Sequence, residues 1–187
     1  MQPVPVVHQL SDIYQDINGS LEEKHKPRYI NLQRRFRELY GEIPTFYCRA
    51  PGRVNIIGEH IDYCGYSVLP AALEQDFIMA YILSDDGKIT INNIDKDQYP
   101  EAVLTTDPEQ SLSEAGSFIN YFLCGYKAIL AFSSPVKDSV AQPRGMKILI
   151  DSIVPPAAGL SSSSAFTVCA AITTAHANGV LHNLDQA

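Results

Sequence analysis

The sequence has 187 residues, of which 45% are hydrophobic and 19% are charged, and its formal net charge is -7. This length and composition are typical of one folded domain and exclude a largely disordered chain. An acidic protein lacks the basic surface that nucleic-acid backbones require, so we expect no nucleic-acid partner, although backbone N–H groups could still hold a nucleotide's phosphates.

The four cysteines are Cys48, Cys64, Cys124 and Cys169, and no two of them form a CxxC pair. This spacing favours reduced thiols in a cytosolic protein over a disulfide framework or a zinc site. The first residues do not combine a basic start with a long apolar run, and we find no stretch of about 18 apolar residues. We therefore expect a cytoplasmic protein with no membrane partner.

Residues 1–26 are polar and show no sustained hydrophobic period, which indicates an N-terminal extension. From Pro27 the apolar residues recur at helical spacing as far as Tyr40. Proline suits a first helical turn, and Gly41 is typical of the position just past a helix end. The sequence therefore predicts a helix that begins near Pro27.

Extended segments follow this helix. We expect short strands over 45–49 and 53–57, separated by a turn at Pro51-Gly52. Residues 68–83 and 88–94 are also predicted strands, and the Asp85-Asp86-Gly87 turn between them indicates a hairpin.

The later elements are a helix, a strand and a small-residue helix, predicted over 118–132, 146–154 and 162–179, with Asn183-Leu184 opening another helix. Strands and helices mix without a regular βαβ alternation, so we predict an α+β fold rather than a doubly wound sheet.

The segment from Pro155 to Ala165 places a Pro-Pro turn, a glycine and a serine run directly before a helix. The first N–H groups of a helix have no internal partners and carry the positive end of its dipole. Gly159 would let the backbone approach an anion, and the hydroxyls of Ser161 to Ser164 could donate to phosphate oxygens or bind Mg²⁺. On the serine run alone, a hydroxyl that simply caps the helix is the more common case.

A second polar group lies in the segment from Gly52 to Pro70, which reads GRVNIIGEHIDYCGYSVLP. Between apolar strands it concentrates Arg53, Asn55, Glu59, His60 and Asp62, and all of these except Asn55 are candidate site residues. Carboxylates bind vicinal hydroxyls such as those of sugars, and an arginine offers a planar fork for a phosphoryl group. Each residue also has an ordinary structural role open to it, as a surface ion pair, a turn residue or a half-buried histidine. Metal binding is disfavoured because a fourth ligand at suitable spacing is missing.

Together these two segments resemble the galactokinase family of the GHMP kinases. The stretch 52–70 is similar to the family's signature, and 155–165 is similar to its PxxxGLxSSxA phosphate loop, in the same order along the chain. The resemblance covers residues 43–187. It implies the GHMP-kinase N-terminal domain (ribosomal protein S5 domain 2-like), a mixed sheet with helices packed on one side.

The resemblance also implies an activity, the ATP-dependent phosphorylation of the anomeric hydroxyl of N-acetylgalactosamine or galactose to the α-1-phosphate. Arg53 would be the catalytic arginine. The residues that would hold sugar hydroxyls are Glu59, His60 and Asp62. The residues that would hold the ATP phosphates are Gly159, Ser161, Ser162 and Ser163. Ser163 would in addition be the Mg²⁺ ligand.

Two details refine the resemblance. The run from Cys64 to Ser67 is more similar to N-acetylgalactosamine kinases than to ordinary galactokinases. The stretch from Phe118 to Tyr121 resembles the family's Trp-x-Asn-Tyr stretch with phenylalanine in place of tryptophan, and this aromatic residue would stack near the adenine. The family's catalytic aspartate and its third, Gly-rich motif follow the serine-loop helix. We therefore expect residues 27–187 to be the N-terminal part of a kinase that is monomeric at full length and inactive in this portion alone. The alternatives are ordinary galactose specificity, a non-catalytic sugar- and ATP-sensing regulator of the same fold, and an inactive fragment.

Overall fold

The fold is given by a computed structural model that describes residues 4–16, 18–133 and 142–181. Its elements are η1 (Leu10–Asp12), α1 (Ser20–Tyr40), β1 (Phe46–Ile57), β2 (Leu69–Ser84), β3 (Lys88–Asn93), β4 (Ala102–Thr105), α2 (Ile119–Ser133), β5 (Gly145–Ser152) and α3 (Ser162–Ala177). Helices α2 and α3, β3 and β5 confirm the sequence prediction, whereas β4 was not predicted. The predicted helix at Asn183-Leu184 lies outside the described residues.

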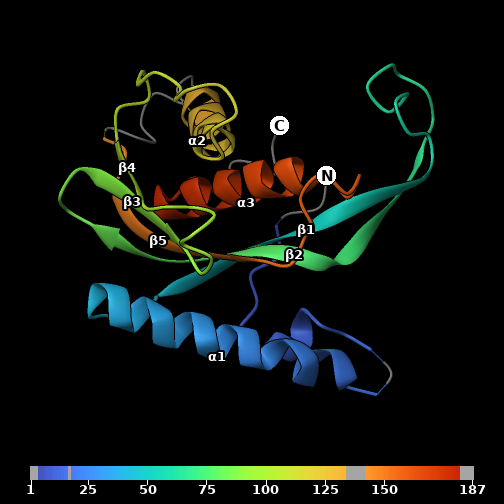
Figure 1. Cartoon of the computed structure of the whole chain (residues 1–187), viewed down its shortest axis with the longest axis horizontal. Coiled ribbons are helices and arrows are strands. Elements are labelled where there is room, and N and C mark those ends of the chain that lie inside the picture. The colour runs from blue at the N-terminus through green and yellow to red at the C-terminus, as the bar shows by residue number, and fades with distance from the viewer. Residues whose placement is uncertain (1–3, 17, 134–141, 182–187) are drawn as a thin grey trace.

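The five strands form one sheet in the order β1-β2-β5-β3-β4. β3 and β5 run parallel and the other pairs are antiparallel, so the sheet is mixed and the predicted α+β class is confirmed. The expectation that the helices pack on one side holds for α2 and α3 only. Helix α1 covers the opposite face of the sheet (Figure 1).

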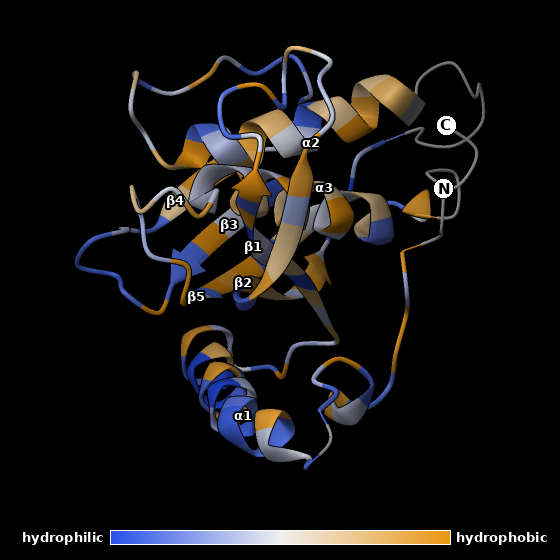
Figure 2. Cartoon of the chain, turned by 90° about the vertical axis from the view of Figure 1, so that its right-hand side faces the viewer, coloured by the Kyte–Doolittle hydropathy of each residue, from blue (hydrophilic) through white to orange (hydrophobic). Residues whose placement is uncertain are grey.

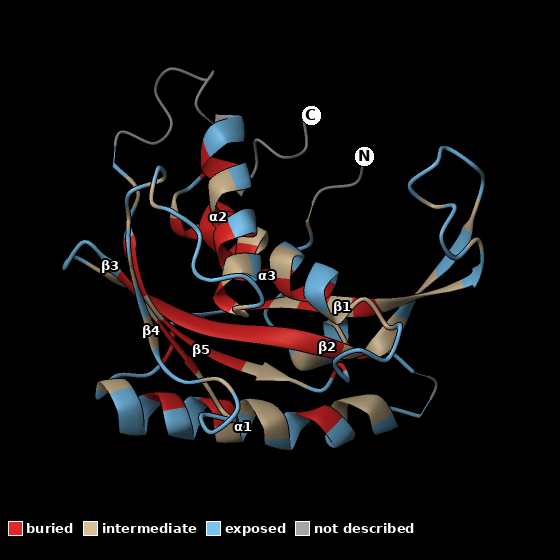
Figure 3. Ribbon diagram, turned by 45° about the horizontal axis from the view of Figure 1, so that its top comes forward, coloured by how far each residue is buried: buried red, intermediate tan, exposed pale blue. Residues whose placement is uncertain are grey.

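The two faces explain why β2 is apolar almost throughout. Its alternate residues Phe77, Met79 and Tyr81 belong to the core under α2 and α3. Ile78 and Ala80, between them, pack against α1. A strand buried on both faces has a continuous apolar run rather than an alternating one, and Figure 3 shows β2 and β5 buried between the helical layers.

Helix α1 begins at Ser20, seven residues before the predicted start, and Pro27 lies inside it. The Asp16 carboxylate accepts hydrogen bonds from the Ser20 N–H (3.2 Å) and hydroxyl (2.5 Å) at the helix start. Most described residues before Pro27 are exposed, but they include η1 and the first turns of α1, and Tyr14 and His25 among them are buried. Polar residues that are buried through hydrogen bonds leave no hydrophobic period, which is why the sequence pattern missed them.

Most of α1 is hydrophilic in Figure 2, in contrast to the strands that it covers. Gly41 ends the helix as predicted, with φ of 75° and its N–H bonded to the Arg37 carbonyl at 2.9 Å. Among the described residues, no helix has both the length and the apolar character to cross a membrane. All four cysteines are free, with Cys48 and Cys169 buried.

One predicted turn and one predicted hairpin are wrong. Pro51 and Gly52 lie inside the single strand β1, at an irregularity in its pairing with β2. A proline is tolerated there because β1 is an edge strand, where a missing N–H need not break a ladder. β2 and β3 do not form a hairpin, because β5 lies between them. Gly145 begins β5 in this narrow gap, where a Cβ would lie 2.6 Å from the Ser84 carbonyl oxygen.

Candidate functional site

The loop between β5 and α3 has an unusual backbone conformation and leads directly into the first turn of the helix. Ala157, Gly159 and Ser161 have positive φ angles of 55°, 72° and 57°. Such angles are uncommon outside glycine and cluster at ligand-binding sites. Ser161 occupies the position before the first helical residue, but its side chain makes no capping hydrogen bond. The simple helix cap considered from the sequence is therefore not what this serine forms, and the first N–H groups of α3 stay free of a side-chain cap.

A cavity of about 770 Å³ lies beside this loop. Its walls include the loop itself, with Gly159 and all of Ser161 to Ser164. The lining also includes an aromatic group, which we call the aromatic wall; its residues are Phe77, Tyr99, Phe118, Tyr121 and Phe166. This volume lies within the range of about 300–1,000 Å³ that ligand sites occupy.

The aromatic wall is ordered by ring stacking. Phe77 and Phe166 stack in parallel with their centroids 5.2 Å apart, and Phe118 stacks on Phe166 at 6.4 Å. Tyr99 meets Phe118 edge to face at 5.2 Å. Only Phe118 and Tyr121 of these were noted in the sequence. The others come from a loop and from inside a strand and a helix, where no local pattern marks a wall residue.

The second candidate segment forms a projecting hairpin, which we call the arm and define as residues 53–72. In Figure 1 it extends away from the body of the molecule beyond the sheet. At its base Asp62 accepts hydrogen bonds from Arg53 Nη2 and from Asn55 Nδ2, each at 3.0 Å. Glu59 lies within ion-pair distance of Arg53, 3.7 Å from Nη1. The structure thus brings together three of the four predicted side chains, and Asn55 holds the aspartate as well.

The four predicted residues of the arm are not equally placed. Glu59 is the one that reaches the cavity wall. Arg53 Nη1 is buried and has no hydrogen-bond partner within the described part of the chain. His60 is exposed on the loop with φ of 66°, and no interaction joins its imidazole to the other three in this structure.

The arm and the phosphate loop meet directly. The Arg53 N–H donates to the Leu160 carbonyl at 3.1 Å. Gly52 permits this approach, because a Cβ there would lie 2.9 Å from the same oxygen. Two segments far apart in sequence therefore meet at one site, and Glu59 of the arm lines the same cavity as the serine loop.

Known protein families match both segments. The galactokinase galactose-binding signature matches residues 34–82, and the GHMP kinase N-terminal domain matches residues 120–187. A galactokinase of Schizosaccharomyces pombe is 37% identical over 96% of this chain and 35% of its own length. A galactokinase of Candida maltosa is 35% identical over 84% of this chain and 73% of its own length. The chain belongs to the galactokinase family.

Solved structures agree with this assignment. A Lactococcus lactis galactokinase complexed with galactose superimposes on 83% of this chain and 37% of its own, with a TM-score of 0.63 and 25% identity. The fold is thus the predicted N-terminal domain of a GHMP kinase. The chain spans about a third of the length of the first curated relatives that it matches.

Proposed function

We propose that this galactokinase-family chain is part of an ATP-dependent sugar kinase, which transfers the γ-phosphoryl group of ATP to the anomeric hydroxyl of the sugar. The observation that carries the proposal is the joint between Arg53 and Leu160. It brings the serine loop and the arm together, with Glu59 of the arm lining the same cavity as the loop. Phosphoryl transfer depends mainly on positioning and charge stabilisation, and this arrangement would supply both.

The loop side would bind ATP. The uncapped N–H groups of Ser162 and Ser163 stand at the positive end of α3, where phosphate oxygens are favoured. Gly159 keeps the backbone before them free of a side chain. The aromatic wall, with Phe118 and Phe166, offers flat surfaces to the adenine, and such contacts contribute about 0.5–1.5 kcal/mol beyond burial alone.

Mg²⁺ would accompany the nucleotide. Within the described residues, no three His, Cys, Asp or Glu side chains are grouped as a metal site. We assign the cation to the Ser163 hydroxyl together with the phosphate oxygens. Ser163 is exposed at the start of α3, which suits a ligand shared with a bound nucleotide.

The arm side would bind the sugar. Glu59, His60 and Asp62 would accept hydrogen bonds from sugar hydroxyls. Arg53, which Asp62 already holds, has one buried nitrogen left for a phosphoryl oxygen. We assign none of residues 1–187 as the base that takes the proton from the anomeric hydroxyl.

The sugar itself is narrowed by two observations. The relatives are named as galactokinases, and one is solved with galactose. The run from Cys64 to Ser67, which resembles N-acetylgalactosamine kinases, is exposed at the tip of the arm. We propose that this tip leaves room for a 2-acetamido group, so that N-acetylgalactosamine is a substrate alongside galactose.

The test is sugar-dependent ADP release by the natively expressed protein, with galactose, N-acetylgalactosamine and glucose compared and the product identified by ³¹P NMR. We expect an α-1-phosphate from the first two sugars and none from glucose. Binding of sugar and ATP without turnover would instead favour a non-catalytic regulator. A strong preference for galactose would contradict the acetamido proposal alone.

A further inference from the structure

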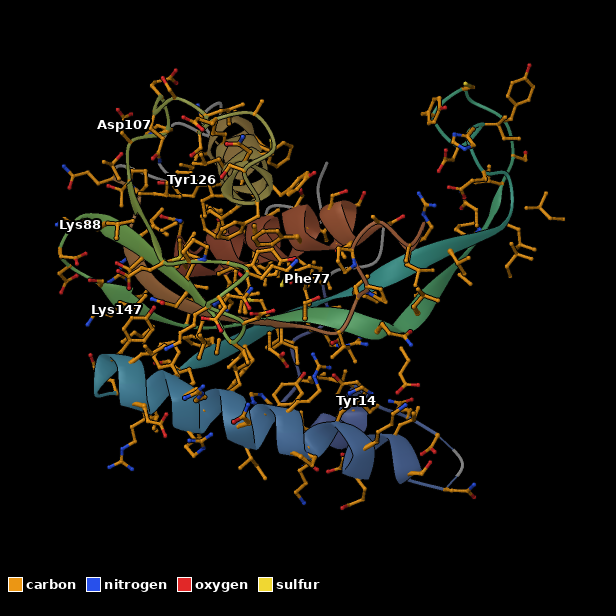
Figure 4. The ribbon with its side chains drawn as sticks, viewed as in Figure 1. Tyr14, Phe77, Lys88, Asp107, Tyr126 and Lys147 are labelled. Atoms are coloured by element: carbon orange, nitrogen blue, oxygen red, sulfur yellow. The ribbon has the colours of Figure 1, made fainter. Side chains whose placement is uncertain are left out.

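A group of buried and partly buried charged and polar side chains lies beneath the arm, outside the phosphate loop. It joins α1 and the segment before it to the sheet, and we call it the basal network. Its members are Tyr14, Arg28, Arg49, Asp76 and Asp151. Figure 4 shows Tyr14 between α1 and the sheet, on the side of the molecule from which the arm extends.

Asp76 is the centre of the network. Its carboxylate is fully buried and accepts hydrogen bonds from Tyr14 Oη (2.8 Å), Arg28 Nη1 (2.8 Å) and Arg49 Nε (2.5 Å). A buried carboxylate with several donors is stable as long as its partners remain, and loss of one partner is costly. The network therefore fixes its members in one arrangement.

Arg28 links two strands through one guanidinium. Nη1 bonds Asp76 on β2, and Nε bonds Asp151 on β5 at 2.9 Å. Burial opposes protonation, but the hydrogen bond to Asp76 and the charge of Asp151 outweigh it and raise the pKa of Arg28. Arg28 is thus a permanent cation that holds β2 and β5 at a set separation from α1.

The network lies where both candidate segments leave the sheet. Asp76 is opposite Pro51, beside the irregularity that precedes Arg53. The carbonyl of Asp76 also accepts the Ile153 N–H at 3.1 Å, just before the phosphate loop. One residue is therefore tied to the start of the arm and to the start of the loop.

Beyond this base the arm has little packing. Its large apolar side chains are mostly exposed, with Ile57 69%, Tyr63 76% and Tyr66 69% accessible. A hairpin without a packed face depends on its base for its direction. The base is formed by the continuation of the β1–β2 ladder, by the Arg53–Leu160 hydrogen bond and by the basal network.

We infer that the basal network is a positioning device, in which Arg28 fixes the direction of the arm relative to the body of the molecule and so the spacing between sugar and ATP phosphates. The effect of the basal network on catalysis rests on the proposed function. Its effect on the position of the arm does not, and this position can be measured without any enzymatic reaction.

The chain carries the labels for that measurement. Cys64 on the arm and Cys124 on α2 are exposed, whereas Cys48 and Cys169 are buried. Burial raises the pKa of Cys48 to about 11 and raises that of Cys169 as well, so neither forms the reactive thiolate readily. A nitroxide reagent would label Cys64 and Cys124, and pulsed electron paramagnetic resonance would report the distribution of distances between arm and body.

Arg28→Met is the main variant. Asp76 keeps Tyr14 and Arg49 as donors, so we expect the chain to fold. The distance distribution should become at least about twice as broad as in the unsubstituted chain. Arg34→Met is the matched control on the same helix, because Arg34 is exposed and pairs with Glu38 on the surface. It should leave the distribution unchanged.

The same distribution in Arg28→Met as in the unsubstituted chain would overturn the inference, because a network that only adds stability would lower the free energy of unfolding without moving the arm. If circular dichroism shows Arg28→Met to be unfolded, Arg28→Lys decides by the same criterion. It keeps the charge but not the guanidinium fork, and should broaden the distribution by a smaller amount.

In the natively expressed enzyme, Arg28→Met should lower kcat/KM for the sugar about tenfold, with Arg28→Lys between it and the unsubstituted enzyme. If the unsubstituted enzyme transfers no phosphoryl group, the proposed function fails, and the distance measurement still decides the role of the network.

Discussion

The arm and the face of the sheet covered by α2 and α3 differ in how closely they are packed. On the covered face, helices approach so tightly that a Cβ at Gly125 would lie 2.4 Å from the Thr167 carbonyl oxygen. On the arm, a Cβ at Gly65 would meet nothing within 4 Å. The buried residues of α2 and α3 face the sheet, whereas most residues of the arm face solvent (Figure 3).

This difference in packing suggests that the two regions have different roles, one in stability and the other in catalysis. Burial of apolar surface and close packing supply most of the free energy of folding, and both are concentrated under α2 and α3. The arm instead carries Arg53, Glu59 and Asp62, the side chains that we propose act on the substrates. Changes on the arm should therefore alter catalysis more than stability, and changes at the helix contact should do the reverse.

The largest effect is expected at Arg53. Arg53→Met removes a cation that would stabilise the transferring phosphoryl group, and loss of one such donor lowers kcat by about 10²–10³. The free energy of unfolding should stay nearly constant, because the ion-pair partners of Arg53, Glu59 and Asp62, also lie on the arm. Steady-state kinetics and urea denaturation of the same preparation measure both. If Arg53→Met lowered the free energy of unfolding by as much as it raised the activation free energy, the arm would contribute to stability as well as to catalysis, contrary to this prediction.

Gly125→Ala should have the opposite signature. The added methyl group meets backbone atoms of Thr167 and Ala171 and forces α2 away from α3. Overpacking of this kind lowers the free energy of unfolding by about 1–3 kcal/mol. Cys124→Ala, at the exposed neighbouring position, is the control for α2 and should change it little. If the KM for the sugar also rises, by a factor that corresponds to a similar free energy, the packed face affects sugar binding and the two regions do not act independently.

Gly52→Ala tests the joint between the regions and should affect both properties modestly. Its Cβ would lie 2.9 Å from the Leu160 carbonyl oxygen and 3.3 Å from Val154 Cγ1. We expect a loss of about 1 kcal/mol in the free energy of unfolding and, by misplacing the arm, a roughly tenfold loss in kcat/KM. Ala72→Ser adds an atom on the exposed arm instead and is the control. No kinetic change in Gly52→Ala would show that the contact is not needed for catalysis.

The sequence predicted the elements whose signals are local. Gly41 ends α1 as expected, and β2, β3, β5, α2 and α3 lie where their apolar patterns predicted them, whereas β4 was not predicted. What failed were pairings and buried polar contacts. Asp85-Asp86-Gly87 does form a turn, but local chemistry cannot tell that a strand beginning at Gly145 is inserted beside it. Long-range pairing depends on the whole core and not on the turn.

The same distinction applies to the site. Arg53, Asp62 and the serine run were found because their segments carry a dense local pattern and a family resemblance. Asp76 and Arg28 were not, since a charged residue in a strand or helix is normally read as exposed. Their burial follows from mutual pairing across α1, β1 and β2, which only the folded structure displays.

The smallest expected effect concerns His176, under the packed face. Burial lowers the pKa of its imidazole below the usual 6.5, and Nδ1 lies 2.5 Å from Tyr81 Oη. The unfolded chain therefore binds a proton more readily than the folded one at this position. This contribution to stability is present above about pH 6.5 and is lost as pH falls from there toward the lower pKa of the folded state.

His176→Gln should flatten the rise in the free energy of unfolding between about pH 5 and pH 7. Urea denaturation at several pH values gives the free energy of unfolding of the variant and of the unsubstituted chain. The difference between them at each pH isolates the contribution of His176 from that of carboxylates that titrate in a similar pH range. His60→Gln removes an imidazole from the exposed arm and is the matched comparison. His60→Gln could flatten the dependence of the free energy of unfolding on pH as much as His176→Gln does. In that case the arm contributes to folding more than its exposure indicates, and the contrast between the two regions is wrong.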